Sequence, residues 1–212
     1  MARIDVVLEE GKKRTFASAL DWPGWARSGT SGDDAIDALS SYRDRYAEVL
    51  GVSSIDGPSG TLHVREVLRG DATTDFGAPG KVAELDHRAL RPADRATFAA
   101  ILVACWSRFD DVASSAGALR TGPRGGGRQV DAMRRHVTDA EVAYARGLGL
   151  RATATDGDVE AVAALRSRVL GLLDNSVAPD REPRWPLRYA VRRIAWHVCD
   201  HLFEIEDRST AE

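Results

Sequence analysis

The chain has little cysteine: only Cys105 and Cys199 occur in its 212 residues. So small a number excludes a disulfide framework of the kind found in small secreted domains, and we expect both thiols to be small buried side chains. The sequence also lacks an apolar run long enough for a transmembrane helix. Its opening segment, MARIDVVLEE, has no apolar core of a signal peptide. These absences predict a cytoplasmic protein that does not have a membrane as its partner.

A strong charge of one sign is missing as well. The formal net charge is −3, from 29 basic and 32 acidic side chains. This balance argues against a broad basic surface for nucleic acid. Hydrophobic residues make up 43% of the chain, which is enough for a core and excludes chain-wide disorder. A length of 212 residues suits one large or two small domains.

The first part of the chain has the pattern of a small sheet with a helix. Apolar residues alternate along 4–8, which predicts a strand, and 14–20 fits the return strand of a hairpin. Asp33 is placed to cap a helix that ends at Gly51. A third strand is predicted at 61–68, followed by a loop rich in Gly, Thr, Asp and Pro at 70–80.

The remainder of the chain has helical periodicity. Apolar residues recur with a period near 3.6 and predict helices at 94–116, 129–146, 158–173 and 187–207. Four helices joined by modest loops predict an antiparallel bundle, whose core can hold a metal between facing helices. The expected fold class is therefore α+β, with a small α/β domain at 1–85 packed on a helical domain at 86–212.

Three histidines are the strongest functional signal. His197 and His201 are four residues apart in the last predicted helix, so their imidazoles share one face. His136 lies in the second predicted helix of the bundle. Two imidazoles at this spacing can chelate a divalent ion, and a third from a facing helix completes three protein ligands. Three ligands leave coordination positions open, as in catalytic sites.

A structural explanation of the same pattern remains open, because a histidine pair at helical spacing is common without a metal. The surroundings favour the metal. Small residues accompany His136 on its face of the helix, at Ala140, Ala143 and Gly147. Such residues leave room for an ion and a ligand, which a histidine needed only for core packing would not require.

The helical half resembles the DinB superfamily of metal-binding four-helix bundles. The resemblance rests on His136 in the second helix and the His197–His201 pair in the last, and it covers about residues 88–208. It implies a divalent metal site, and zinc, nickel or iron would each suit imidazole ligands. The superfamily includes enzymes that use low-molecular-weight thiols such as mycothiol or bacillithiol, among them thiol S-transferases and a maleylpyruvate isomerase, while many members have no known reaction.

The N-terminal half resembles the HicB antitoxin domain. The resemblance rests on the segment FASALDWPGW at 16–25, on Ser28-Gly29 and on the helix from Asp33, and it covers about residues 3–51. Trp22 and Trp25 depart from the small residues more usual there, and no DNA-binding helix-turn-helix or arm follows. The resemblance therefore implies the small α/β fold and not antitoxin function. Because large apolar side chains are unfavourable on a mobile loop, at least one of these tryptophans should be buried.

Further candidates lie around the three histidines. Glu204 shares the face of His197 and His201, and it could serve as a partner to an imidazole N–H, a fourth ligand or a catalytic base. It could equally be a solvated residue near the helix end. Arg124 and Arg128 lie in the glycine-rich segment 122–128 and could bind an acidic cofactor or substrate, although a flexible turn explains that segment too.

Two functions remain as hypotheses. The first is a metal-dependent enzyme in which His136, His197 and His201 hold the ion and Glu204 assists. It would use a thiol such as mycothiol for transfer to, or isomerisation of, a small electrophile. The second is a non-catalytic metal-binding or regulatory protein with a HicB-like interaction module. A small-molecule substrate and a thiol are the expected partners, and a homodimer is left open as the assembly.

Overall fold

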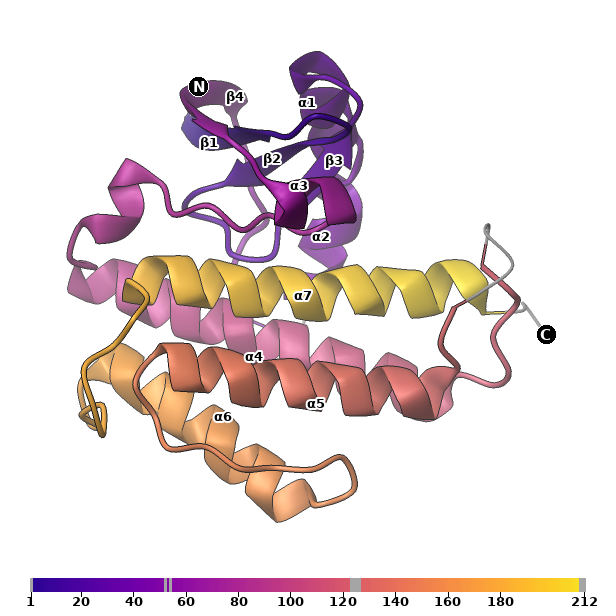
Figure 1. Ribbon diagram of the computed structural model, residues 1–212, viewed down its shortest axis with the longest axis vertical. Helices are drawn as coiled ribbons and strands as arrows, with labels where there is room; N and C mark the ends of the chain where they lie inside the picture. The colour runs from indigo at the N-terminus through magenta and orange to yellow at the C-terminus, as the bar shows by residue number, and fades with distance from the viewer. Residues whose placement is uncertain (1, 52, 54, 123–126, 210–212) are drawn as a thin grey trace.

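The computed structural model describes residues 2–51, 53, 55–122 and 127–209. It has an α+β architecture in which a four-stranded sheet and its helices lie on one side of a group of long helices (Figure 1). The elements are, in chain order, β1 (Arg3–Glu10), β2 (Thr15–Ala19), β3 (Ala26–Gly29), α1 (Gly32–Ser41), α2 (Arg43–Leu50), β4 (Thr61–Arg69), α3 (Ala72–Phe76), the 3₁₀ helix η1 (Glu84–His87), α4 (Pro92–Ser115), α5 (Val130–Gly147), α6 (Val159–Asp174) and α7 (Leu187–Arg208).

The sheet is mixed, with the strand order β3-β2-β1-β4. Strand β1 pairs antiparallel with β2 and parallel with β4, so that Val6 lies opposite both Ala19 and Val64. Because successive side chains of a strand point to opposite faces, β1 contributes to two cores. Val6 belongs to the main hydrophobic core, whereas Val7 packs with Leu20 and Ala83 in a smaller cluster.

The N-terminal half follows the predicted order with three differences. Strand β3 was not predicted, because the sequence ARSG has no apolar alternation. The predicted helix over 33–51 is divided at Tyr42 into α1 and α2, and Ser31 caps α1 by accepting from the backbone N–H of Asp34, so the prediction of Asp33 as the cap was wrong. The predicted loop at 70–80 contains the short helix α3.

The four long helices begin and end within two residues of the predicted bounds. Helix α4 contacts α6 and α7, and α5 contacts the same two helices. Helix α7 lies between the N-terminal sheet and the other long helices (Figure 1), and residues are buried along its whole length. None of the described helices combines the length and the apolar character needed to cross a membrane.

Contacts between the two halves confirm that they pack together. A single hydrophobic core cluster contains residues of the sheet and of the long helices. Trp25 is 2% exposed, as predicted for at least one of the two tryptophans. Arg188 of α7 donates through Nη1 to Asp21 Oδ1 at 2.7 Å across the two halves. Arg192 of α7 forms a buried ion pair with Asp86 of η1, at the start of the helical half, and its Nε donates to Asp86 Oδ1 at 3.0 Å. The boundary between residues 85 and 86 itself stays a prediction.

The buried pair of Arg192 with Asp86 gives a test of the packing of α7 against η1. Replacing Arg192 with Met leaves the Asp86 carboxylate, 2% exposed, without its charged partner. The free energy of unfolding should fall by about 3–5 kcal/mol, which urea denaturation can measure. The control is Arg91→Met, which removes an ion pair to Asp94 whose arginine is 81% exposed and should leave stability nearly unchanged. Equal effects of the two substitutions would show that the Asp86–Arg192 pair does not hold η1 against α7.

Candidate metal centre

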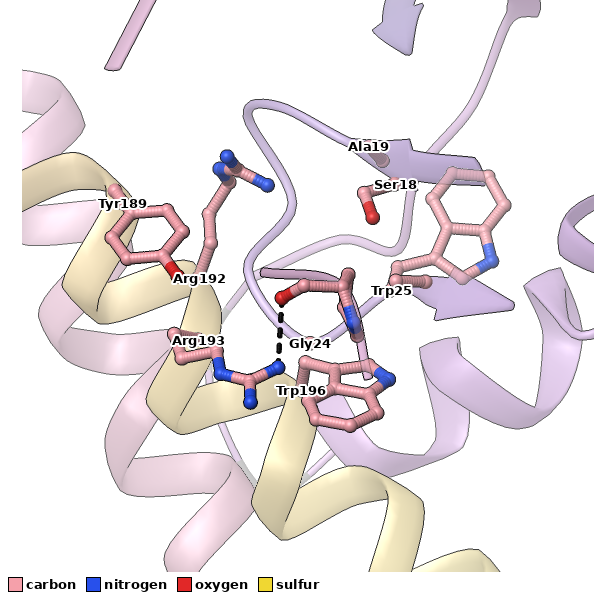
Figure 2. A pocket seen from close by; sticks show the side chains of 10 residues that line it. Ser18, Ala19, Gly24, Trp25, Tyr189, Arg192, Arg193 and Trp196 are labelled. Atoms are coloured by element: carbon pink, nitrogen blue, oxygen red, sulfur yellow. Dashed lines mark hydrogen bonds between the residues drawn. The ribbon is translucent and has the colours of Figure 1, made fainter. Parts of the chain in front are cut away.

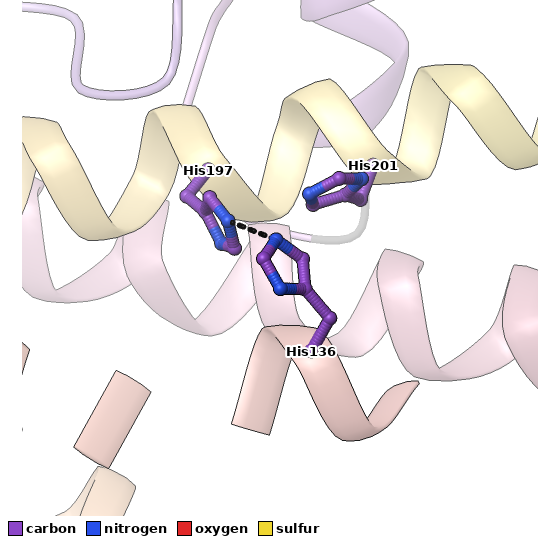
Figure 3. A group of neighbouring side chains, drawn as sticks. All are labelled: His136, His197 and His201. Atoms are coloured by element: carbon purple, nitrogen blue, oxygen red, sulfur yellow. Dashed lines mark hydrogen bonds between the residues drawn. The ribbon is translucent and has the colours of Figure 1, made fainter. Parts of the chain in front are cut away.

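The three predicted histidines converge on one point (Figure 3). His197 and His201 project from one face of α7, with ring centroids 4.6 Å apart. His136 projects from α5 between them, with its ring centroid 5.0 Å from that of His197 and 4.9 Å from that of His201. His136 and His197 are 61 residues apart in the sequence, so two distant segments of the chain supply one cluster.

The separations between the ring nitrogens fit a shared ion. His136 Nε2 and His197 Nε2 are 3.2 Å apart. Two nitrogens bound to one tetrahedral zinc at about 2.0–2.1 Å would be separated by roughly 3.3–3.4 Å. One ligand atom from each histidine lies within 4.8 Å of the others. Small side-chain rotations are therefore enough for the three imidazoles to surround one ion.

Burial keeps two of these imidazoles in the form that binds metal. His197 is 7% exposed, and this burial lowers its pKa well below the usual value, with His201 and His136 adding to the effect. Burial also lowers the pKa of the half-buried His136. A neutral imidazole has a free lone pair on one nitrogen, whereas a protonated one has none. Both side chains are thus available as ligands at neutral pH.

Glu204 lies beside the histidine cluster, where it contacts His201. Its Oε2 is 3.2 Å from His201 Nδ1, and its Oε1 accepts from Arg208 Nη1 at 2.6 Å. The hydrogen bond with His201, followed by that with Arg208, lowers the pKa of Glu204, so the carboxylate is ionised. A carboxylate that accepts from Nδ1–H fixes the imidazole tautomer and leaves Nε2 free for a metal. These contacts favour an orienting role, while the assignment of Glu204 as catalytic stays a prediction.

A cavity of about 820 Å³ adjoins this carboxylate. Its lining includes Glu204 together with three arginines, Arg27, Arg120 and Arg208, and two further acids, Asp200 and Asp207; the three histidines do not line it. The sequence prediction placed arginines near the site but at other positions. Only Arg208 carried a sequence signal, because it lies four residues after Glu204 on the same helix face.

Of the two arginines predicted to bind a cofactor, the structure describes only Arg128. Arg124 lies outside the described residues. Arg128 is exposed, two residues before α5 begins, and its positive charge contributes to lowering the pKa of His136. It is therefore near the histidines without lining the cavity beside Glu204. Its role in binding a cofactor stays a prediction.

Aromatic side chains border the cluster on the His197 side. The ring centroids of Tyr144 and Trp196 lie 5.7 Å and 6.1 Å from that of His197. The small size of Gly147 makes room for Trp185, whose ring packs against Tyr144, because a Cβ at position 147 would lie 2.7 Å from the Trp185 ring. The expectation that Gly147 leaves room for an ion was therefore wrong, since Trp185 fills that space.

The other histidines and the cysteines are not part of the cluster. His63 and His87 are exposed. Cys105 and Cys199 are free and buried, which confirms the prediction made for them. Among the residues that the structure describes, the three histidines form the one group of side chains placed to hold a metal.

Comparison with known proteins found no match to a family model, a curated protein or a solved structure. The resemblances to DinB and HicB proteins therefore depend on the residues quoted above, and the site is interpreted from its own geometry.

Removal of the histidine on α5 tests the convergence. His136→Ala should abolish tight zinc binding, because two imidazoles on one helix hold the ion less firmly than three from two helices. Helical content should be unchanged, since His136 is only half-buried. Metal content of protein purified without a histidine tag and circular dichroism give the two readouts. The control is His87→Ala, which removes an exposed histidine outside the cluster; zinc binding that survives both substitutions would contradict the site.

The orienting role of Glu204 has its own test. Glu204→Gln should weaken zinc binding about 10–100-fold, because partners that orient a ligating histidine have effects of this size. Calorimetric titration measures the affinity. Glu206→Gln is the matched control two residues away, since Glu206 pairs with Arg45 and Arg108 and does not contact a histidine. If both variants bind zinc as the unmodified chain does, Glu204 does not orient His201.

Proposed function

We propose that His136, His197 and His201 hold a divalent metal ion, and that the chain is a metal-dependent enzyme of the DinB type. The proposed reaction is thiol-dependent, either transfer of a thiol such as mycothiol to a small electrophile or isomerisation of such a compound. The convergence of three histidines from α5 and α7, with ligand atoms within 4.8 Å of one another, is the observation that carries this proposal.

The helical half fits a four-helix bundle with the DinB arrangement. Helix α7 contacts α4 and α5, and α6 contacts the same two helices, so each long helix has two neighbours. The ligands come from the second and the fourth of these helices, which is the placement that the resemblance implies. We also propose that the mixed sheet, with α1 against β2 and β3, has a HicB-like fold.

The chemistry expected of the site follows from its donor set. A divalent ion held by neutral imidazoles lowers the pKa of a thiol or water bound to it and so supplies a nucleophile at neutral pH. The residues of the chain have supporting roles. Glu204 orients His201, and Arg208 holds Glu204 in place. Buried walls around His197 restrict the access of competing water.

The cavity beside Glu204 is the proposed binding site for the acidic groups of a thiol or its acceptor. Arg27 and Arg120 belong to segments outside the long helices and face this cavity with Arg208. A guanidinium group binds a carboxylate through two parallel hydrogen bonds. The acids of the same cavity balance these charges, so a ligand with both amino and carboxylate groups would suit it better than a polyanion.

One observation favours the alternative of a non-catalytic metal site. His197 and His201 are 7% and 8% exposed, and neither lines the cavity beside Glu204. A buried ion without an approach for substrate would stabilise the fold or serve regulation. The rate of metal exchange distinguishes the two functions, because an ion with open positions exchanges with chelators while an enclosed one does so slowly.

The enzyme proposal predicts metal-dependent conjugation. Zinc-, nickel- or iron-loaded protein should catalyse the reaction of mycothiol or bacillithiol with a bimane electrophile, measured by fluorescence of the conjugate. His136→Ala should reduce the rate to that of the uncatalysed reaction, and His87→Ala should leave it unchanged. A chain that binds metal tightly but gives no rate with any of these metals, and whose melting temperature does not respond to either thiol, would favour the non-catalytic alternative.

A further inference from the structure

Two buried thiols meet at the interface between α4 and α7. Cys105 of α4 and Cys199 of α7 are 0% and 1% exposed, and their Sγ atoms are 3.4 Å apart. They are the only cysteines of the chain. The proposed metal centre does not use them, because Cys199 points away from the face of α7 that carries His197 and His201.

The sulfur atoms are close enough for a bond after a small movement. A disulfide has an S–S distance of about 2.0 Å, so the sulfurs would approach each other by roughly 1.4 Å. The two residues are 94 positions apart, so the bond would close a long loop and tether α7 to α4.

The turn between β2 and β3 lies against this pair of thiols. The turn that leads from β2 to β3 passes over Cys199, and a Cβ at Gly24 would lie 3.0 Å from Cys199 Sγ. Gly24 has φ +97°, a backbone conformation that glycine adopts readily. The same turn carries the buried Trp25, which stacks on Tyr46 with ring centroids 5.9 Å apart. Gly24 is therefore one of the groups that cover the Cys199 thiol, and an oxidant reaches the buried pair only through local opening of the packing around it.

We propose that Cys105 and Cys199 are a reversible oxidation site that forms an intramolecular disulfide with a hydroperoxide as the oxidant. One thiol attacks the peroxide oxygen, the O–O bond breaks, and a sulfenic acid and one molecule of water or alcohol are produced. The second thiol then displaces the sulfenic hydroxyl group, and the S–S bond forms as a second water leaves. Two electrons and two protons thus pass from the thiols to the peroxide, and a small dithiol reverses the change.

Oxidation should stabilise the fold, because the bond restricts the unfolded chain more when the closed loop is long. A rise in melting temperature of about 5–15 °C is expected for a chain of this size. This inference does not depend on the proposed enzyme function. The metal centre can fail its tests while the disulfide forms, and the reverse holds as well.

Intact mass measurement tests the proposal on the folded, full-length chain. Hydrogen peroxide should lower the mass by two hydrogens and make both cysteines resistant to alkylation after subsequent unfolding. The protein should remain monomeric on a non-reducing gel, and dithiothreitol should restore both thiols and the original melting temperature. Cys105→Ala and Cys199→Ala should each prevent the loss of two hydrogens, and their own folding is checked by circular dichroism.

Several outcomes would overturn the proposal. The first is that both thiols can still be alkylated after an exposure to peroxide that oxidises a cysteine-containing peptide. The others are a stable gain of oxygen in place of the loss of two hydrogens, and a disulfide that forms only between chains. A disulfide that appears only under conditions that unfold the protein would overturn it too. The decisive measurement is made on the unmodified chain, so the proposal can be decided even if a cysteine variant fails to fold.

Discussion

Burial of α7 between the sheet and the other long helices is the constraint on which the rest of the structure depends. A buried helix must find partners for its polar side chains, because an unpaired buried charge is strongly unfavourable. Arg192 pairs with Asp86, Arg188 with Asp21, and Arg208 with Glu204. The pair with Asp21 connects α7 to the N-terminal half, and the pair with Asp86 connects α7 to η1. The pair of Arg208 with Glu204 lies toward the C-terminal end of α7, next to His201.

His197 and His201 are also buried polar side chains of this helix, and neither is a member of these arginine–carboxylate pairs. Burial makes the neutral form of His197 the stable one, and its Nε2 faces His136 from α5. Among the residues that the structure describes, none is a hydrogen-bond partner of its Nδ1. Polar side chains buried at such a cost are expected to have a reason, and a shared metal ion supplies one. Metal binding would at the same time join α5 to α7, so the proposed function and the stability of the helical half are coupled.

The side chains of α7 also form three chemically different groups, which lie on different faces of the helix. The histidines occupy one face, and Cys199 lies on another against Cys105. Arg192 and Trp196 line a pocket together with Gly24 and Trp25 from the turn before β3 (Figure 2). Arg193 contributes there by donating to the carbonyl oxygen of Pro79 at 2.7 Å. One helix can therefore carry the proposed metal centre and the proposed oxidation site and still anchor the sheet, because its faces are chemically distinct.

Much of this arrangement could be predicted from the sequence where periodicity is strong. The long helices have an apolar repeat near 3.6, so their bounds and the shared face of His197 and His201 followed directly. Strand β3 and the break at Tyr42 depend on tertiary contacts that leave no local pattern. Arg27 and Arg120 reach the cavity from outside the long helices, where spacing does not predict position. Gly147 shows the same limit. Its small size makes room for Trp185, which lies 38 positions later in the chain.

The central claim is that three histidines from two helices bind one metal ion. Anomalous diffraction from crystals of zinc-loaded protein, measured at the zinc absorption edge, tests it most directly. The account predicts one strong peak at about 2.0–2.2 Å from a ring nitrogen of each of His136, His197 and His201, with remaining positions open to solvent or ligand. A peak elsewhere, or no peak while the three rings keep their present separation, would contradict it.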